Sequence, residues 1–369
     1  MNKAVGIMDK RNIIITILTV VFVHVFVLFL VLLPGCSSTS GSTDISIKPP
    51  PPEVQQPDAV FSADKSLPES PSKPAVKVRR SGERAKRPLP VSTAGALNGK
   101  ILDLKNWSKK SPRNYDRVCG ILVDLNNRRI LWQLNPDKQV PIASLTKIMT
   151  LLLSYEMLQQ PQCAITLDTE IEITPKSRKI PPSGVAFRAN EKSFPLNKLM
   201  KAAAVKSAND ATYLIAQTFG NGSAETFVKY MNMRAKELGM YQTKFYNPHG
   251  LPGKNEGTPD NVSSVRDLAI LSEAYLTFPE LHSWSSATTA TFRTKNDLIS
   301  HNNLLKRGKY HTPGVSGIKT GYTSNAGLCL ATVCDREGRR LLAIVTGFNS
   351  AADRDTFTKN LLEWGYRQK

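Results

Sequence analysis

Histidine is scarce in this chain. It has five histidines among 369 residues, and no two of them follow the His-x-His or His-Glu-x-x-His spacing that brings two imidazoles to one metal ion. This absence excludes the familiar zinc peptidase motifs. We predict that the protein needs neither a metal nor another cofactor.

Cysteine is also rare, with five residues in the whole chain. Cys36 lies near the N-terminus, and the others are Cys119, Cys163, Cys329 and Cys334. Cys329 and Cys334 are five residues apart on one predicted strand, so their side chains face opposite sides of it and do not pair. The sequence permits a disulfide in another pairing. We nevertheless expect Cys119, Cys163, Cys329 and Cys334 to be small buried hydrophobic residues.

Acidic side chains are outnumbered: 30 Asp and Glu stand against 49 Lys and Arg, a formal net charge of +19. Residues 76–111 alone hold ten basic and two acidic side chains. Such a segment either contacts anionic lipid headgroups or acidic wall polymers, or it merely stays solvated. We expect no nucleic-acid partner, since that would require a cytoplasmic protein and the N-terminal segment argues against that compartment.

The N-terminal segment combines a basic pair, Lys10 and Arg11, with an apolar stretch over residues 13–33. Its 21 residues are enough to cross a bilayer. The stretch ends in Leu33-Pro34-Gly35-Cys36, which resembles the lipobox of bacterial lipoproteins. We predict a signal or anchor segment over residues 1–36, held by a lipid on Cys36 or by an uncleaved helix. Either anchor places the rest of the chain on the periplasmic, extracytoplasmic face of the membrane.

The composition changes sharply after Cys36. Ten of the 24 prolines lie in residues 37–111, among many Ser, Lys and Glu, and apolar periodicity disappears there. This composition is typical of a disordered, polyproline-rich tether. The remaining residues, 112–369, have the length of one ordinary domain.

The periodic segments of that domain predict its fold class. A hairpin is expected over residues 118–125 and 129–134. Two more strands, 328–334 and 340–348, come near the end and precede a closing helix over 352–364. Because the middle of the domain is mostly helical, we predict an α/β protein of the α+β type. Its antiparallel sheet would be flanked by helices, and a helical subdomain would lie beside it.

Three short motifs follow one another through the domain. They are Ser144-Leu145-Thr146-Lys147, Ser207-Ala208-Asn209 and Lys319-Thr320-Gly321. Each alone is a weak signal. The ordered series S-x-x-K, S-x-N and K-T-G, however, is the signature of enzymes that acylate a serine with penicillin or with peptidoglycan peptides.

The first motif predicts an activated nucleophile. Ser144 stands at the start of an apolar, helix-like run, and a residue three positions on shares its helix face, so Lys147 lies beside the hydroxyl. An ammonium cannot accept a proton. The pKa of Lys147 must therefore be lowered, by desolvation and by a second nearby cation.

The second motif lies between two helix-like segments, 196–206 and 210–219. A short connection there can point both side chains into a cleft. We predict that Ser207 passes a proton between Lys147 and the leaving nitrogen, and that the Asn209 amide binds a substrate peptide group.

The third motif is predicted to end a strand-like run over residues 315–318. Gly321 lets a substrate backbone lie close to the strand. Lys319 and the Thr320 hydroxyl suit a carboxylate, one by charge and the other by hydrogen bonding. The backbone N–H groups of Ser144 and Tyr322 are predicted to form the oxyanion hole.

With these motifs, residues 115–366 resemble the D-alanyl-D-alanine carboxypeptidases, which are low-molecular-mass penicillin-binding proteins of the active-site-serine peptidase type. The series Asn247 to Leu251 and Gly317 to Gly327 also match that family's pattern. The resemblance implies a β-lactamase/transpeptidase-like fold, an acyl-enzyme on Ser144, release of the terminal D-alanine and inhibition by β-lactams. Many relatives carry a further β-domain and a C-terminal amphipathic anchor, and we expect neither here.

Alternatives from other classes stay open. A D,D-endopeptidase that cuts peptidoglycan cross-links would use the same catalytic groups. A class A β-lactamase is disfavoured, because no Glu-x-x-Leu-Asn motif follows Asn209. A lipoprotein that binds the wall without turnover is disfavoured by the intact Ser144, Lys147 and Lys319.

Overall fold

The structure is a computed structural model that describes residues 117–368 except for residues 182 and 256. The predicted anchor, the predicted tether and Cys36 lie outside the described residues. Within them, no helix is both long and apolar enough to cross a membrane.

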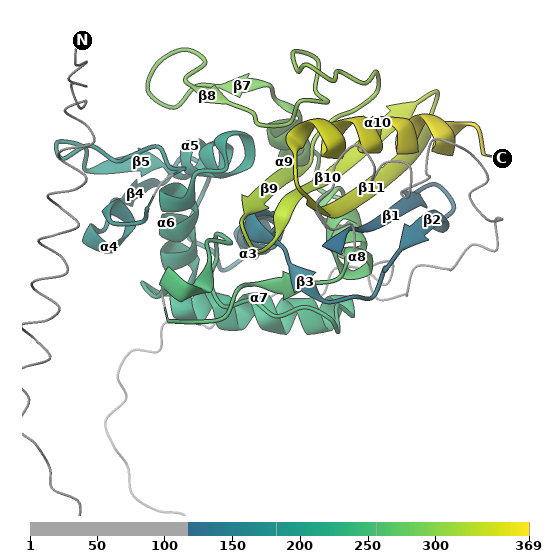
Figure 1. Cartoon of the computed structure of the whole chain (residues 1–369). Coiled ribbons are helices and arrows are strands. Elements are labelled where there is room, and N and C mark those ends of the chain that lie inside the picture. The colour runs from purple at the N-terminus through teal and green to yellow at the C-terminus, as the bar shows by residue number, and fades with distance from the viewer. Residues whose placement is uncertain (1–116, 182, 256, 369) are drawn as a thin grey trace, which may run out of the picture. The chain divides into compact units, whose positions relative to one another are not determined.

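A five-stranded antiparallel sheet forms the centre of one part of the domain, with the strand order β2-β1-β11-β10-β9 (Figure 1). The predicted hairpin and the two late strands are present. The bounds of the five strands are Cys119–Asp124 (β1), Arg129–Leu134 (β2), Lys319–Thr323 (β9), Gly327–Arg336 (β10) and Arg339–Phe348 (β11). The antiparallel sheet expected from the sequence is therefore confirmed.

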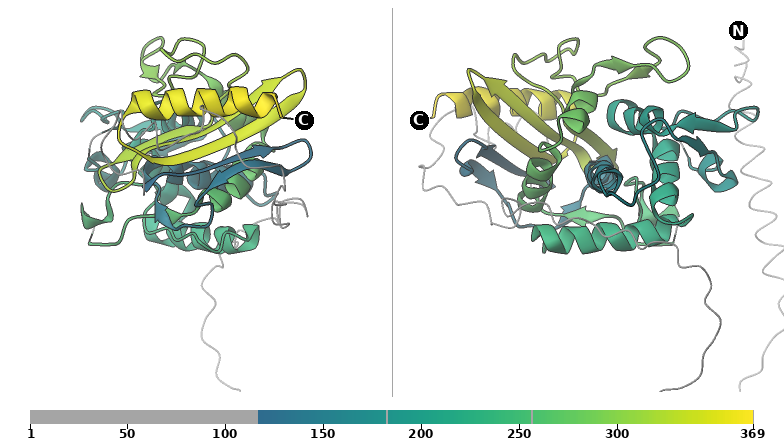
Figure 2. Two further views of the ribbon diagram at one scale, coloured as in Figure 1. Left: turned by 45° about the vertical axis from the view of Figure 1, so that its right-hand side comes forward. Right: turned by 180° about the vertical axis from the view of Figure 1, so that it is seen from behind.

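Helices cover both faces of this sheet (Figure 2). Helix α10 (Ala351–Tyr366) packs on one face, where Phe357 and Leu361 join an apolar cluster with Leu122 and Leu330 of the strands. Helix α8 (Val265–Tyr275) packs on the other face, in the larger cluster that contains Ile344. Neighbouring strand residues thus alternate between two apolar layers, as period-2 side-chain placement requires.

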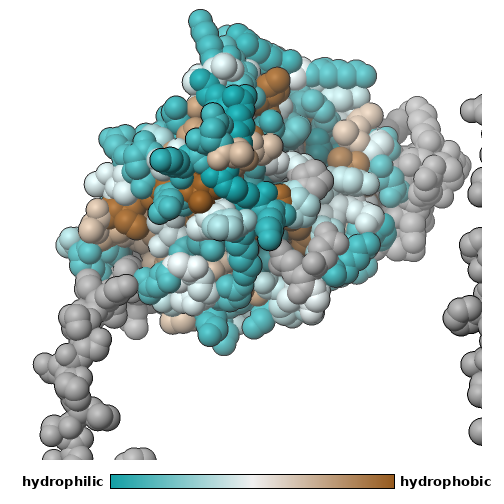
Figure 3. All heavy atoms as spheres, turned by 90° about the vertical axis from the view of Figure 1, so that its left-hand side faces the viewer, coloured by the Kyte–Doolittle hydropathy of each residue, from teal (hydrophilic) through white to brown (hydrophobic). Residues whose placement is uncertain are grey.

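The rest of the domain is mostly helical, as predicted. It comprises the short helix η3 (Ala143–Leu145) and the helices α3 (Thr146–Leu158), α4 (Pro175–Arg178), α5 (Leu196–Lys201), η4 (Ala202–Lys206, a π-helix), α6 (Asn209–Phe219), α7 (Ala224–Leu238), η5 (Gly253–Asn255) and α9 (Pro279–Ser286). Three two-stranded ribbons accompany them, namely β3 (Val140–Pro141) with β6 (Val262–Ser263), β4 (Glu170–Glu172) with β5 (Ser193–Pro195), and β7 (Thr289–Ala290) with β8 (Leu298–Ile299). The lobe around α4, β4 and β5 has a largely hydrophilic surface with small hydrophobic areas (Figure 3).

One expected strand boundary is wrong. The third motif was predicted to end a strand-like run over residues 315–318, whereas it begins the strand β9 at Lys319. The reason lies at Gly317, whose φ of 96° interrupts the extended backbone. The N–H groups of Ser316 and Ile318 still donate to β10 carbonyls, but the Gly317 carbonyl accepts from the side chains of Asn302 and Thr332 and not from a backbone N–H.

The cysteines of the described residues are free thiols. Cys329 belongs to the apolar cluster on the α8 face and Cys334 to the cluster on the α10 face, which confirms that they point to opposite sides of β10. Burial raises the pKa of the Cys329 thiol to about 12. Cys119 is buried as well, but Cys163 is only half-buried, so the expectation of four buried thiols is wrong at that position.

Candidate active site

A cleft of about 500 Å³ opens between β9 and the helical part of the domain. All three motifs reach it. The predicted site residues among its lining are Ser144, Ser207, Asn209, Thr320, Gly321 and Tyr322. The fold therefore brings together segments that lie up to about 180 residues apart in the sequence.

Ser144 lies on the short helix η3, directly before α3, and so at the helix start expected from the sequence. The turn is held firmly. Ala143 has a φ of 46°, which costs energy for a residue other than glycine, and its carbonyl accepts a hydrogen bond from Thr146 Oγ1 at 2.8 Å. Asn261 in turn donates to Thr146 Oγ1. The nucleophile is thus presented by a fixed turn.

Lys147 is completely buried beneath Ser144. Its Nζ atom lies 3.0 Å from Ser144 Oγ, 2.6 Å from Asn209 Oδ1 and 2.5 Å from the His249 carbonyl oxygen. The last two atoms can only accept hydrogen bonds. A neutral amine would therefore direct its two hydrogens to them and leave its lone pair toward the serine hydroxyl. This arrangement is suited to removal of the Ser144 proton.

The electrostatic surroundings favour that neutral amine. Burial, and then the charge of Lys319, hold the pKa of Lys147 well below its usual value, while Asp210 opposes the shift. Both lowering causes are those that the sequence predicted.

The two side chains of the second motif differ in what they contact. Ser207, with a φ of 63°, closes the π-helix η4 and lines the cleft. Among the described residues, no hydrogen bond joins its hydroxyl to Lys147 or Ser144. Asn209 begins α6 and accepts the hydrogen bond from Lys147. Fixing the lysine is a role of Asn209 that the sequence did not indicate.

The third motif lies on β9, the edge strand of the sheet. Lys319 is buried, and its Nζ donates to the Thr320 carbonyl at 2.9 Å. Burial and the neighbouring Arg354 lower the pKa of Lys319 to about 7. Thr320 lines the cleft, whereas Lys319 is not among its lining residues.

Close packing requires a glycine at position 321, which the sequence did not reveal. A Cβ at this position would lie 3.1 Å from the backbone nitrogen of Ser144 and 3.2 Å from the Ile142 carbonyl oxygen. Glycine thus lets β9 pass close to the nucleophile turn as well as leaving its open edge unobstructed. The close approach brings the edge of β9 beside the Ser144 N–H.

Arg354, on helix α10, is a cleft residue that the sequence analysis missed. It is 97% buried, paired with Asp355 at 2.6 Å, and it donates to the Cys329 carbonyl. A lone arginine 35 positions after Lys319 carries no motif, so only the packing of α10 against the sheet could place it in the site.

One protein-family model matches the part of the chain that carries these three motifs. The model of peptidase S11, described as D-alanyl-D-alanine carboxypeptidase, matches residues 108–350. The chain belongs to this family.

Individual relatives of this family agree with the assignment. D-alanyl-D-alanine carboxypeptidase DacF of Bacillus subtilis is 31% identical over 268 residues, which are 72% of this chain and 66% of DacF. A D-alanyl-D-alanine endopeptidase of Pseudomonas aeruginosa is 32% identical over 57% of this chain and 64% of its own length. The chain spans just under two thirds of the length of these relatives.

Solved members of the family confirm the fold. Penicillin-Binding Protein D2 from Listeria monocytogenes, determined in an ampicillin-bound form, is 30% identical. It superposes with a TM-score of 0.61 over 69% of this chain and the whole of that protein. The transpeptidase-like fold expected from the sequence is therefore confirmed.

Proposed function

We propose that this protein is a serine-type D-Ala-D-Ala carboxypeptidase that removes the terminal D-alanine from peptidoglycan pentapeptides and is inhibited by penicillin. The observation that carries the proposal is the 3.0 Å contact between Lys147 Nζ and Ser144 Oγ, made by a lysine whose other two contacts are acceptors. Family membership and the ampicillin-bound relative support the substrate class.

In the first half of the reaction, Ser144 Oγ attacks the carbonyl carbon of the penultimate D-alanine and Lys147 takes its proton. The N–H groups of Ser144 and Tyr322 donate to the developing oxyanion. The proton then passes through Lys147 and Ser207 to the leaving nitrogen, the C–N bond breaks and D-alanine departs. In the second half, water attacks the ester and loses its proton to Lys147. The lysine passes that proton to Ser144 Oγ as the ester bond breaks, and the shortened peptide leaves with a new terminal carboxyl group.

The carboxylate of the terminal D-alanine is assigned to the end of the cleft at Thr320. The Thr320 hydroxyl donates a hydrogen bond to it, and the nearby buried Lys319 supplies positive charge, whereas the charge of Arg354 is balanced by its ion pair with Asp355. An anionic group bound there would also keep Lys319 protonated. Recognition of the carboxylate is thereby linked to the charge that lowers the pKa of Lys147.

The main alternative is a D,D-endopeptidase, since a relative of that kind matches at similar identity. The two are separated by incubating the full chain in detergent with pentapeptide muropeptides and, separately, with cross-linked dimers. We expect D-alanine and tetrapeptides from the first substrate and intact dimers in the second. Conversion of dimers to monomers without release of free D-alanine would show an endopeptidase, and no product from either would contradict the proposal.

We further propose that the domain works outside the cytoplasmic membrane, carried on a tether over residues 37–111 and anchored through residues 1–36. The lipobox-like sequence before Cys36 supports a lipid anchor. Cys36→Ala is then expected to abolish incorporation of labelled fatty acid and to leave the N-terminal segment uncleaved, as seen by intact-mass spectrometry. A wild-type mature protein that retains residues 13–33 would instead show an uncleaved helix as the anchor.

A further inference from the structure

We propose that Arg293 is a positioning residue of the active site, which clamps the segment 183–186 against the start of helix α6 and so holds Asn209 on Lys147. The inference rests on the proposed function and names a residue outside the three motifs. Arg293 lies in the loop that joins β7 to β8.

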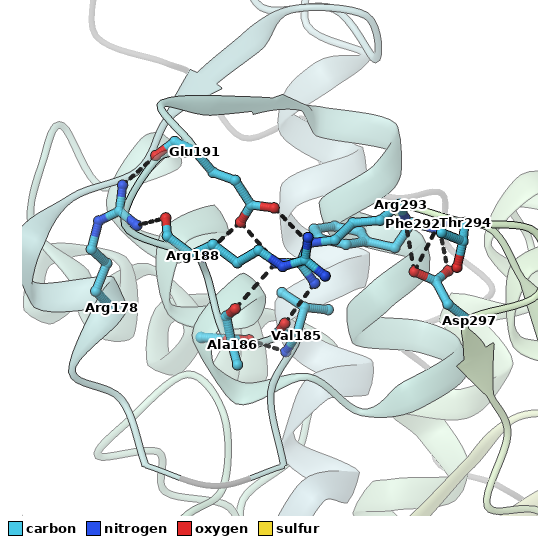
Figure 4. Close-up of polar contacts among 10 residues, drawn as sticks. Arg178, Val185, Ala186, Arg188, Glu191, Phe292, Arg293, Thr294 and Asp297 are labelled. Atoms are coloured by element: carbon cyan, nitrogen blue, oxygen red, sulfur yellow. Dashed lines mark hydrogen bonds and ion pairs between the residues drawn. The ribbon is translucent and has the colours of Figure 1, made fainter.

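The guanidinium of Arg293 contacts three residues of the segment 183–191 at once (Figure 4). It pairs with both carboxylate oxygens of Glu191, at 2.5 and 2.8 Å. It also donates to the carbonyl oxygens of Val185, at 2.7 Å, and Ala186, at 3.1 Å. The cation therefore fixes the backbone of the segment as well as one acidic side chain.

Asp210 contacts the backbone of the same two residues through their N–H groups. Its carboxylate accepts hydrogen bonds from the N–H groups of Val185, at 3.0 Å, and Ala186, at 2.8 Å. A Cβ on Gly184 would lie only 2.4 Å from Asp210 Oδ2, so glycine is required for this approach. The segment is thus held between an anion on α6 and a cation on the β7–β8 loop.

This doubly held segment leads directly to the catalytic groups. Ser183 lines the cleft, and its backbone carbonyl accepts a hydrogen bond from the backbone N–H of Asn209 at 2.8 Å. Asn209 in turn accepts from Lys147. A chain of contacts therefore runs from Arg293 through Val185, Ser183 and Asn209 to Lys147, and displacement of the segment would move the hydrogen-bond partner of this lysine.

The surroundings of Arg293 indicate that its orientation is set in advance. Its guanidinium lies 5.0 Å from the ring centre of Phe292 and 5.7 Å from that of Phe194, where cation–π attraction adds to the ion pair. The loop that carries it is fixed by Asp297, which accepts from the N–H groups of Phe292 and Arg293. A lysine could not reproduce a planar fork with four contacts.

The test compares Arg293→Gln with Arg128→Gln in the full chain. Arg128 is a matched control, because the side chains of its ion pair with Glu273 are each 18% exposed, close to the 17% of Arg293 and the 15% of Glu191. The control pair joins the β1–β2 turn to α8, away from the cleft. The readouts are the melting temperature and the second-order rate constant of acylation by a fluorescent penicillin, measured well below melting.

We expect Arg293→Gln to acylate about 10- to 100-fold more slowly, since displacement of a catalytic group by about 1 Å has an effect of that order. Arg293→Lys should be intermediate and Arg128→Gln unchanged in rate. Water admitted around Lys147 should also move the acid limb of the pH–rate profile of Arg293→Gln to higher pH. If both glutamine variants lose only thermal stability, Arg293 is merely structural and the inference is wrong.

A charge swap distinguishes two effects of Arg293. One is the backbone clamp, meaning its hydrogen bonds to the carbonyls of Val185 and Ala186, and the other is its ion pair with Glu191. The double variant Arg293→Glu/Glu191→Arg restores opposite charges but turns a carboxylate toward the carbonyls of Val185 and Ala186. We expect it to regain thermal stability and not the acylation rate. Full recovery of the rate would contradict the backbone clamp. Failure of the wild type itself to acylate would instead contradict the proposed function.

Discussion

Ser144→Ala is expected to abolish covalent labelling by fluorescent penicillin and to lower D-alanine release by about 10⁶-fold, the scale seen when a serine hydrolase loses its nucleophile. The substitution removes one hydroxyl from a turn that is held by Ala143, Thr146 and Asn261 rather than by the serine side chain. The fold should therefore be retained, with a melting temperature within a few degrees of the wild type. Intact-mass spectrometry after penicillin treatment measures the adduct directly.

Ser183→Ala is the matched control for this variant. Ser183 lines the same cleft, and none of the hydrogen bonds among the described residues joins its hydroxyl to a lysine. Its replacement should leave the mass increase with penicillin intact. An adduct mapped by peptide digestion to Ser183, Ser207 or any other serine would overturn the mechanism.

Lys147→Ala should leave the nucleophile in place without its base, and acylation should slow by about 10²–10⁴-fold, the usual contribution of general-base catalysis. The change also leaves Asn209 Oδ1 and the His249 carbonyl without the lysine that donates to them. Some loss of stability is expected for that reason. Lys147→Gln controls for it, because an amide retains donors for these oxygens but cannot accept the serine proton. Both variants should be slow, and rapid acylation of the glutamine variant would show that Lys147 is not the base.

The pH dependence of the wild type follows from the same residue. Because the folded protein lowers the pKa of Lys147, protonation at acid pH removes the base, and the acylation rate should rise with pH through that ionisation. At higher pH, Lys319, with a pKa of about 7, loses the charge that attracts the substrate carboxylate. The profile should therefore be bell-shaped. Because the two lysines interact, its two apparent pKa values belong to the pair and not to either lysine alone. A stopped-flow profile that lacks an acid limb in the wild type would contradict the role of Lys147.

The motif residues could be found from the sequence because their spacing carries chemistry. A serine and a lysine three residues apart meet on any helix, and a period-2 pattern sufficed to identify the hairpin β1–β2 and the strands β10 and β11. These features depend on short stretches of chain, where local geometry decides the contact.

Residues that act across long sequence separations escaped prediction. Arg354 and Arg293 have no motif around them, and each enters or supports the site only because α10 and the β7–β8 loop pack where they do. The start of β9 was misplaced for a related reason. The side chains of Asn302 and Thr332 hold the Gly317 carbonyl, and no local pattern announces such partners.

The edge position of β9 determines how easily this enzyme could evade an inhibitor. Among the described strands, none pairs with its outer side, so an extended molecule can bind there as an additional strand through the main chain alone. Main-chain recognition does not depend on side-chain identity. Point mutations along the strand would therefore weaken the binding of a peptide-like drug only where they also disturb the natural substrate. Discrimination between the two is therefore expected from cleft residues outside the strand, among them Ser183 and Asn209.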